Sequence, residues 1–118
     1  MLRTLCNFYD DRDMLLTQDQ TMVRDAVRDF VTEQITPHAA RWDKEHHFPR
    51  DVHQGLAALG AYGICVPEEY GGAGLDYVTL ALVLEEIAAG DGGTSTAISV
   101  TNCPVNAILL RYGNAAQK

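Results

Sequence analysis

Paired glutamates in an apolar segment come closest, in this chain, to a catalytic pattern. Glu85 and Glu86 follow a run of hydrophobic residues, and a carboxylate in such surroundings could act as a general base. No histidine, lysine or second acid stands at a spacing that would let it work with either glutamate. The sequence therefore favours a solvated or ion-paired helix face over a catalytic role for these two carboxylates.

Two adjacent histidines are of a residue type that often binds metal ions. His46 and His47 follow acidic residues, and imidazole and carboxylate groups are common metal ligands. Adjacent residues of a helix point apart, however, because neighbours on one face are three or four positions distant. We expect a solvated loop at this place. His38 and His53 stand alone in the sequence and carry no functional signal.

A glycine-rich segment at residues 71–74 has the composition of a phosphate-binding loop. Such a loop follows a strand and carries a lysine with a serine or threonine, and the sequence here has neither feature. Glu68 and Glu69 lie just before the glycines, and their charges would repel a phosphate. We therefore expect a structural loop in which glycine is needed for positive φ angles.

The segment 92–110 has no charge, although the chain contains 9 Lys and Arg and 16 Asp and Glu. It is too rich in Ser, Thr, Asn and Gly to cross a membrane at low cost. In a helix that turns about 100° per residue, small polar side chains share one stripe: Ser95, Ser99, Asn102 and Asn106. Apolar side chains cover much of the rest: Ile98, Val105, Ile108 and Leu109. This pattern predicts a helix that is buried on most sides.

The small polar stripe has two interpretations. Its side chains could bond to neighbouring backbone, or they could line a largely apolar ligand cavity. Pro104 has no amide proton and clashes with the preceding turn, so we expect a kink or a break near Cys103. Cys103 has no base near it in the sequence, and we expect it to be a buried structural thiol.

Length, charge and cysteine content exclude several classes of protein. A chain of 118 residues is one domain, and its net charge of −7 argues against a nucleic-acid face. The sequence has no cluster of Lys and Arg that would bind an anionic membrane. Its 3 cysteines are widely spaced and form neither a disulfide framework nor a zinc pattern. We therefore expect these cysteines to be free thiols in a reducing compartment.

Helical periodicity and cap signals predict an all-α fold, an up-and-down bundle of four to five helices. The first helix starts at Thr17, where Gln20 completes a capping box. It ends or bends at Pro37. Further helices are expected over residues 39–44, 49–59, 77–90 and 95–110, with another starting after Asn114. Residues 1–15 are interpreted as a loose leader and residues 16–118 as the folded domain.

Several motifs, in order, resemble the opening of an acyl-CoA dehydrogenase. They are Leu16-Thr17-Gln18-Asp19-Gln20, Phe48-Pro49, the long segment 59–76, Leu84-Glu85-Glu86-Ile87-Ala88 and Gly113-Asn114-Ala115-Ala116-Gln117-Lys118. The segment 59–76 is the strongest match, and the resemblance covers about residues 16–118. Residues 94–102 look most like short-chain or short-branched-chain members of the family.

The resemblance implies an FAD enzyme of fatty acid β-oxidation that converts an acyl-CoA to a trans-2-enoyl-CoA. It further implies electron transfer to an electron-transfer flavoprotein and a homo-oligomer, usually a tetramer. In the family the helix that corresponds to residues 95–110 helps to wall the acyl pocket. Four positions are expected to contribute to this wall: Thr96, Ser99, Val100 and Cys103. The same resemblance assigns Glu85 and Glu86 to a helical pattern and not to the catalytic base.

Only the family's N-terminal helical domain is recognised in this sequence. The middle β domain, which supplies most flavin contacts, and the C-terminal helical domain, which carries the base, are absent. We therefore expect no FAD binding by this chain alone. A complete enzyme is expected in the cytoplasm, or in the mitochondrial matrix of a eukaryote. The alternative is a non-catalytic helical interaction subunit, or a fragment, that completes a partner carrying the flavin.

Overall fold

The computed structural model describes residues 15–118, and within that range it contains helices and turns but no strand. The elements are α1 (Gln18–Gln34), α2 (Ala39–Glu45), α3 (Arg50–Ala58), the 3₁₀ turn η4 (Glu68–Tyr70), α4 (Tyr77–Gly90), α5 (Gly92–Val100), the π-helical η5 (Thr101–Asn106) and α6 (Ala107–Tyr112). The predicted all-α class is confirmed. The predicted leader, residues 1–15, lies outside the described residues except for its last position.

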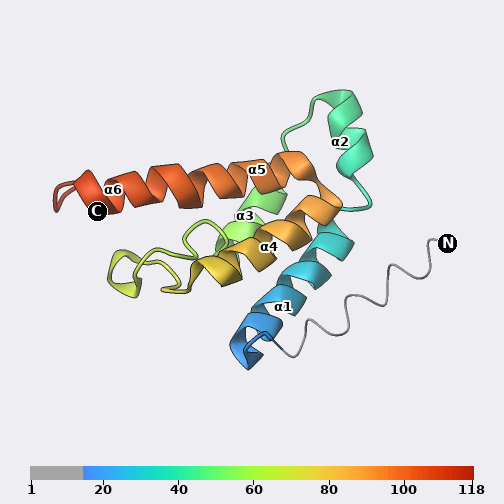
Figure 1. The fold of residues 1–118 in the computed structure, drawn as a ribbon. Coiled ribbons are helices and arrows are strands. Elements are labelled where there is room, and N and C mark those ends of the chain that lie inside the picture. Colours follow the sequence, from blue (N-terminus) through green and yellow to red (C-terminus); the bar gives the residue numbers. More distant parts are fainter. Residues whose placement is uncertain (1–14) are drawn as a thin grey trace.

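The helices form a thin slab whose extents are 54 × 41 × 20 Å. A helix with its side chains is about 10 Å across, so the slab is two helices thick. In Figure 1, α1 and α4 lie side by side, α5 and α6 run as one long rod across α4, and α2 projects at one end. The rod and α4 therefore each have one side toward the core and another side near the surface.

α1 begins as the sequence predicts. Thr17 is its N-cap: Thr17 Oγ1 accepts from the Gln20 amide at 3.1 Å, and Gln20 Oε1 accepts from the Thr17 amide at 3.1 Å. This reciprocal pair is a capping box, which satisfies two amides that the first turn would otherwise leave unpaired. The helix ends at Gln34, shortly before Pro37, as expected.

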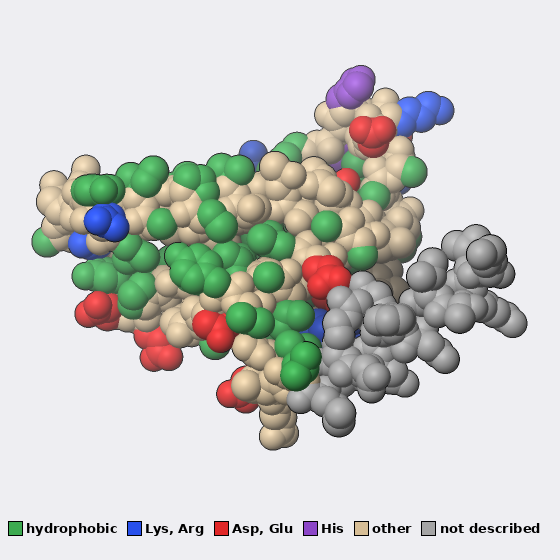
Figure 2. All heavy atoms as spheres, viewed as in Figure 1, with side chains coloured by type: hydrophobic (Ala, Val, Ile, Leu, Met, Phe, Trp, Pro, Cys, Tyr) green, Lys and Arg blue, Asp and Glu red, His purple; other side chains and the backbone are tan. Residues whose placement is uncertain are grey.

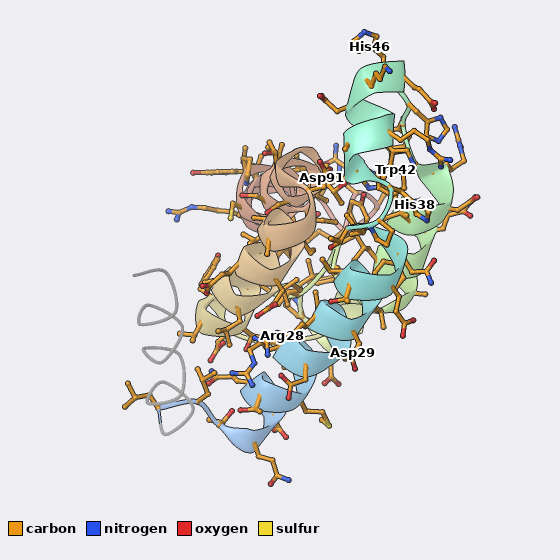
Figure 3. The ribbon with its side chains drawn as sticks, turned by 90° about the vertical axis from the view of Figure 1, so that its right-hand side faces the viewer. Arg28, Asp29, His38, Trp42, His46 and Asp91 are labelled. Carbon is orange, nitrogen blue, oxygen red and sulfur yellow. The ribbon has the colours of Figure 1, made fainter. Side chains whose placement is uncertain are left out.

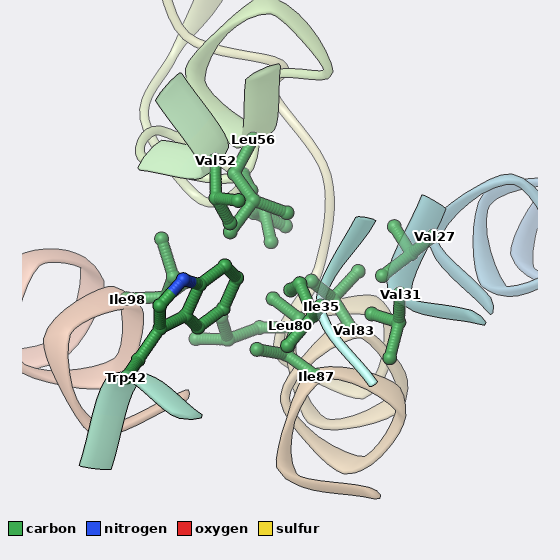
Figure 4. Packing of buried hydrophobic residues seen from close by; sticks show 12 residues of the cluster. Val27, Val31, Ile35, Trp42, Val52, Leu56, Leu80, Val83, Ile87 and Ile98 are labelled. Atoms are coloured by element: carbon green, nitrogen blue, oxygen red, sulfur yellow. The ribbon is translucent and has the colours of Figure 1, made fainter. Parts of the chain in front are cut away.

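One hydrophobic core joins the helices α1 to α5. Figure 4 shows Trp42 of α2 between Ile98 of α5 and the α3 pair Val52 and Leu56. From α1 and α4 the core receives side chains that are at most 4% exposed: Val27, Val31, Ile35, Leu80, Val83 and Ile87. Burial of each such side chain contributes about 1.5–3 kcal/mol, so this contact set fixes the orientation of α2 and α5 relative to α4.

Polar contacts fix the register of α4 against α1. Asp76 is the N-cap of α4, as predicted, and its Oδ1 accepts from the Thr79 amide at 2.8 Å. Its Oδ2 accepts from Gln20 Nε2 at 3.2 Å, which ties the first turns of the two helices together. These bonds lower the pKa of the Asp76 carboxyl below its usual value, since they stabilise the charged form.

The long rod departs from α-helical geometry without breaking. Residues 101–106 form a π-helical segment around Pro104, and the helix continues into α6. The expected disturbance near Cys103 is therefore a change in hydrogen-bond pattern and not a break. In a π segment each hydrogen bond spans one residue more than in an α-helix. This looser turn accommodates Pro104, which has no amide proton to donate.

The prediction that the uncharged helix is buried on most sides is wrong for the described residues. Several of its large side chains are 40–56% exposed: Val100, Val105, Ile108 and Leu109. Tyr77 and Val78 of α4 are also exposed, at 65% and 53%. Figure 2 shows hydrophobic side chains along the α6 end of the rod. Among residues 15–118, no helix is long and apolar enough to span a membrane.

Candidate functional site

The rod formed by α5, η5 and α6 is the candidate site, because the sequence points to it and the fold brings it to the surface. Asp91 starts it as an N-cap: Asp91 Oδ2 accepts from the Thr94 amide at 2.7 Å and from Thr94 Oγ1 at 2.6 Å. The core side of the rod is fixed by Ile98, which is fully buried. Side chains on the opposite side are therefore free to meet a ligand or a partner.

Three members of the small polar stripe bond to neighbouring backbone. Ser95 Oγ donates to the Leu84 carbonyl of α4 at 3.0 Å. Asn102 is buried and donates to the Ala61 carbonyl at 2.8 Å. Asn106 Nδ2 donates to the Tyr62 carbonyl at 2.8 Å. The first interpretation of the stripe is thus confirmed for these three residues, which attach the rod to α4 and to the loop 59–76.

The four predicted wall residues lie together on an outward side of the rod. Thr96 and Cys103 are exposed, Val100 is 49% exposed and Ser99 is half-buried. Their spacing of three, four and seven residues keeps them on one helix face. We call this set, Thr96, Ser99, Val100 and Cys103, the 96–103 face. It is uncharged, and its residues do not line either of the two hollows described below.

The prediction that Cys103 is a buried thiol is wrong. Asn102 and Ile98 occupy the core side of the rod, so the next residue along the helix turns about 100° away from it. Cys103 is consequently exposed, whereas Cys65, in the loop beside the rod, is half-buried. Burial raises the pKa of the Cys65 thiol, and the charges of Cys103 and Asp76 raise this pKa further.

The glycine-rich segment 71–74 is a structural loop, as expected. Its amides bond within the loop itself: those of Gly71, Gly72, Ala73 and Gly74 donate to the carbonyls of Glu68, Pro67, Gly63 and Val66 at 2.8–3.2 Å. Gly71 and Gly74 have φ angles of 81° and 63°, which glycine adopts at no steric cost. The loop borders a hollow of about 410 Å³, but these four amides are already used and form no phosphate cradle.

A second hollow, of about 340 Å³, lies between α2, α3 and the start of α5. His46 and His47, considered above as metal ligands, are among the residues that line it. Its most buried titratable group is His53, which is 8% exposed. The His53 ring stacks on Phe48 at 4.4 Å between centroids, and His53 Nδ1 is hydrogen-bonded to the Tyr62 hydroxyl. A lone histidine gives no pattern in sequence, and its partner Tyr62 follows nine residues later, so no local signal could have found this pair.

Burial decides the protonation of the His53–Tyr62 pair. Desolvation lowers the pKa of His53 from its ordinary value of 6.5, and the charge of Asp91 partly opposes this shift. Desolvation also raises the pKa of Tyr62. At neutral pH both groups are therefore uncharged. A neutral histidine bonded to a phenol could accept a proton, but Asp91, the carboxylate whose charge acts on His53, is already used as a helix cap.

The other sequence candidates have structural roles. His46 and His47 are exposed, and Figure 3 shows His46 at the outer end of α2. No group of three or more His, Cys, Asp and Glu in the described part of the chain could hold a metal ion. Glu86 is ion-paired, since Arg28 Nη2 lies 2.7 Å from Glu86 Oε1. The prediction of an ion-paired face is confirmed for Glu86.

Comparison with known proteins adds a family relationship to this geometry. Residues 17–118 match a family model described as "Acyl-CoA dehydrogenase, N-terminal domain". The chain is 37% identical over 116 residues to the mitochondrial isobutyryl-CoA dehydrogenase of Dictyostelium discoideum, covering 98% of this chain and 28% of that protein. It is 39% identical over 103 residues to the mitochondrial short-chain specific acyl-CoA dehydrogenase of Rattus norvegicus, covering 87% of this chain and 25% of that protein.

A solved structure shares the fold. A chain from a study of the electron transferring flavoprotein of Acidaminococcus fermentans superposes with a TM-score of 0.81 and 33% identity, covering 86% of this chain and 27% of that chain. The chain therefore spans about a quarter of the length of the proteins that it matches.

Proposed function

Because the chain belongs to the acyl-CoA dehydrogenase family, through that family's N-terminal domain, we propose that it is the opening helical domain of an FAD-dependent enzyme. The enzyme oxidises a short acyl-CoA to the trans-2-enoyl-CoA. The observation that carries the proposal is the family match over residues 17–118. Support for a short substrate comes from two matched relatives, which are named for isobutyryl-CoA and for short-chain acyl-CoA.

In this proposal the 96–103 face is part of the wall of the acyl pocket. A pocket for an acyl chain is mostly apolar and has few polar groups, and this face has no charge. Val100 is half-exposed and Ser99 half-buried, so a ligand or a second domain laid on the rod contacts these small side chains. Because these side chains are small, the shape and length of the pocket are determined mainly by the other surfaces that enclose it.

The described residues do not fit a flavin site, so no chemical step passes through them. A flavin dinucleotide has a pyrophosphate that needs free amides or basic side chains. The glycine-loop amides donate to carbonyls of the loop, and the chain has a net charge of −7. FAD and the carboxylate base therefore belong, in this proposal, to protein surfaces other than residues 15–118. The domain contributes binding and packing.

The same family relationship supports the partners and the location that we propose for the complete enzyme. They are an acyl-CoA substrate, an electron-transfer flavoprotein as electron acceptor, and further copies of the enzyme in a homo-oligomer. A matched chain comes from a study of an electron transferring flavoprotein. Two relatives are named as mitochondrial, so we propose the mitochondrial matrix in a eukaryote and the cytoplasm otherwise.

A first experiment determines the intact mass and absorbance of the protein purified from its native source. The proposal expects flavin bands and flavin reduction on addition of butyryl-CoA or isobutyryl-CoA. A colourless protein with the 12.9 kDa mass of the chain, which purifies without any flavin-containing partner, would overturn it.

A matched pair of variants tests the wall. Val100→Phe in the flavin-containing enzyme is expected to lower kcat/KM for butyryl-CoA about tenfold, since a pocket senses each added carbon strongly. Val105→Phe makes the same change at a position of similar exposure, 46% against 49%, outside the 96–103 face. It is expected to leave kcat/KM within about twofold, as surface changes do. Equal effects of the two variants would contradict the wall.

The exposed apolar side of the rod favours a second candidate function. Val105, Ile108 and Leu109 are 40–56% exposed, and apolar patches of this kind mark protein contacts. The chain would then be a non-catalytic subunit that completes a flavin-carrying partner. This candidate expects a 12.9 kDa chain that co-purifies with a separate flavoprotein, and Ile108→Lys is expected to release it. A single longer polypeptide that carries the flavin excludes this candidate.

A further inference from the structure

A buried hydrogen-bonded contact joins the loop 59–76 to the rod. In each of these two segments, a cysteine comes directly after the residue that makes the contact. The Ile64 amide donates to Asn102 Oδ1 at 2.9 Å, and Asn102 Nδ2 donates to the Ala61 carbonyl at 2.8 Å. Cys65 follows Ile64 in the loop and Cys103 follows Asn102 in the rod. The two cysteines are thus 38 positions apart in sequence, but their chain neighbours are in direct contact.

We propose that Cys65 and Cys103 form a redox-sensitive thiol pair, in which a hydroperoxide links the loop 59–76 to the π-helical segment η5 by a disulfide. The proposal does not depend on the enzymatic function assigned above. Both cysteines are free thiols, and the charge of a Cys103 thiolate acts on the Cys65 thiol. The Asn102 contact holds together the residues that precede the two cysteines, Ile64 in the loop and Asn102 in the rod.

Exposure sets the order of the two chemical steps. Cys103 is exposed and Cys65 is half-buried, and a thiolate in contact with solvent is the form that reacts with oxidants. The Cys103 thiolate attacks the peroxide, giving a sulfenic acid and hydroxide. The Cys65 sulfur then displaces water from the sulfenic acid. In total two thiols and one hydrogen peroxide give one disulfide and two waters, so atoms and electrons balance.

The local backbone allows a disulfide between Cys65 and Cys103 without disrupting an α-helix. The π-helical turn at residues 101–106 leaves α-helical geometry where Cys103 lies, and the loop residues 63–66 have turn structure with no helix to disrupt. A disulfide requires Cα atoms about 4.4–6.8 Å apart, and in this proposal a shift of either segment brings Cys65 and Cys103 into that range. Closing the disulfide would hold the loop against the rod at the edge of the 96–103 face.

The test compares disulfide pairing in the folded and the unfolded chain. The chain contains three cysteines, Cys6, Cys65 and Cys103, which allow three intramolecular pairings. The reduced 118-residue chain is treated with hydrogen peroxide in buffer and in concentrated urea, remaining thiols are alkylated, and linked peptides are identified by mass spectrometry. In buffer we expect the Cys65–Cys103 link alone, reversed by dithiothreitol. In urea we expect all three links.

Two outcomes would overturn the proposal. One is the same mixture of links in buffer as in urea. The other is oxidation of Cys103 to sulfinic acid, or to an intermolecular disulfide, while Cys65 is still alkylated. The variant Cys6→Ser gives a second measurement, because it has one possible intramolecular link. It is expected to lose both thiols with one equivalent of peroxide, whereas Cys6→Ser with Cys65→Ser is expected to lose its thiol only through dimers or higher oxidation.

Discussion

Asn102 and Ile64 are joined by a 2.9 Å hydrogen bond across 38 residues of sequence. The same asparagine side chain donates to the Ala61 and Ile98 carbonyls at 2.8 and 3.0 Å. Asn102 is 3% exposed, so water cannot replace any of these partners. This buried side chain therefore helps to hold the loop 59–76 against the rod, together with Asn106, and positions η5.

Replacing Asn102 is expected to destabilise the fold strongly. Asn102→Ala leaves the Ile64 amide and the Ala61 carbonyl without their partner, and the free energy of unfolding should fall by about 2–4 kcal/mol. Urea denaturation followed by circular dichroism measures this change. Asn106→Ala is the matched control, since Asn106 is half-buried and bonds to the Tyr62 carbonyl. Asn106→Ala should lower the free energy of unfolding by about 1 kcal/mol. Equal losses in the two variants would show that the burial of Asn102 does not increase its contribution.

The pH dependence of stability should include a contribution from His53. Burial lowers its pKa in the folded chain below the ordinary value of 6.5, so at pH values near and below 6.5 the unfolded chain binds more protons than the folded one. Stability then rises with pH and is lost as pH falls through 6.5 toward the lowered value. The groups that face His53 are Tyr62, which is bonded to it, Asp91, whose charge opposes the shift, and His46, His47 and Asp43 across the hollow.

Urea midpoints between about pH 8 and pH 5 measure this contribution of His53. His53→Gln keeps a neutral polar group and is expected to flatten the acid side of the profile relative to the unchanged chain. His38→Gln is the control, because it removes a histidine outside this hollow. If the pH profile of stability is unchanged in His53→Gln but changed in His38→Gln, the pH dependence does not come from His53 and the prediction is wrong.

Two adjacent glycines should respond differently to the same substitution. A Cβ atom at Gly72 would lie 2.1 Å from the Val66 carbonyl oxygen, whereas at Gly71 it would meet nothing within 4 Å. Gly71→Ala is therefore expected to cost about 1 kcal/mol for its positive φ angle. Gly72→Ala forces the backbone apart and should cost more than twice as much. Thermal unfolding of the two variants gives the comparison, and equal losses would show that the loop relaxes around the added carbon.

Local signals in the sequence predict the first helices of the chain, but the helix expected after Asn114 is a turn in the structure. The Thr17–Gln20 capping box and the Asp76 cap lie at helix starts in the structure, because a cap and its partner are three residues apart and act before any tertiary contact forms. The all-α class follows from the same periodicity. The rod was predicted to be buried, but the part of the chain that the structure describes does not cover Val100 and Ile108.

The site depends on contacts between distant residues, which leave no pattern in one sequence. The sequence places Asn102 on a polar stripe, but the spacing of residues does not predict its partners in the loop, at residues 61 and 64. His53 gave no signal at all, because its ring partners, Phe48 and Tyr62, are ordinary residues of a linker and a loop. The sequence predicts a buried Cys103, whereas the structure exposes it. When apolar side chains surround almost the whole helix, periodicity does not show which side faces the core.

The ion pair between Arg28 and Glu86 should contribute little and depend on salt. Arg28 donates to both glutamate oxygens, at 3.0 and 2.7 Å, but the arginine side chain is 44% exposed. Water therefore competes with the pair, and a coupling energy of about 0.5–1 kcal/mol is expected. A double-mutant cycle with Arg28→Gln and Glu86→Gln isolates this energy from the other contacts of Arg28. In about 1 M NaCl, where screening acts within about 3 Å, the coupling should fall by at least half. A coupling above about 2 kcal/mol that does not change with salt would show that the pair behaves as a buried one.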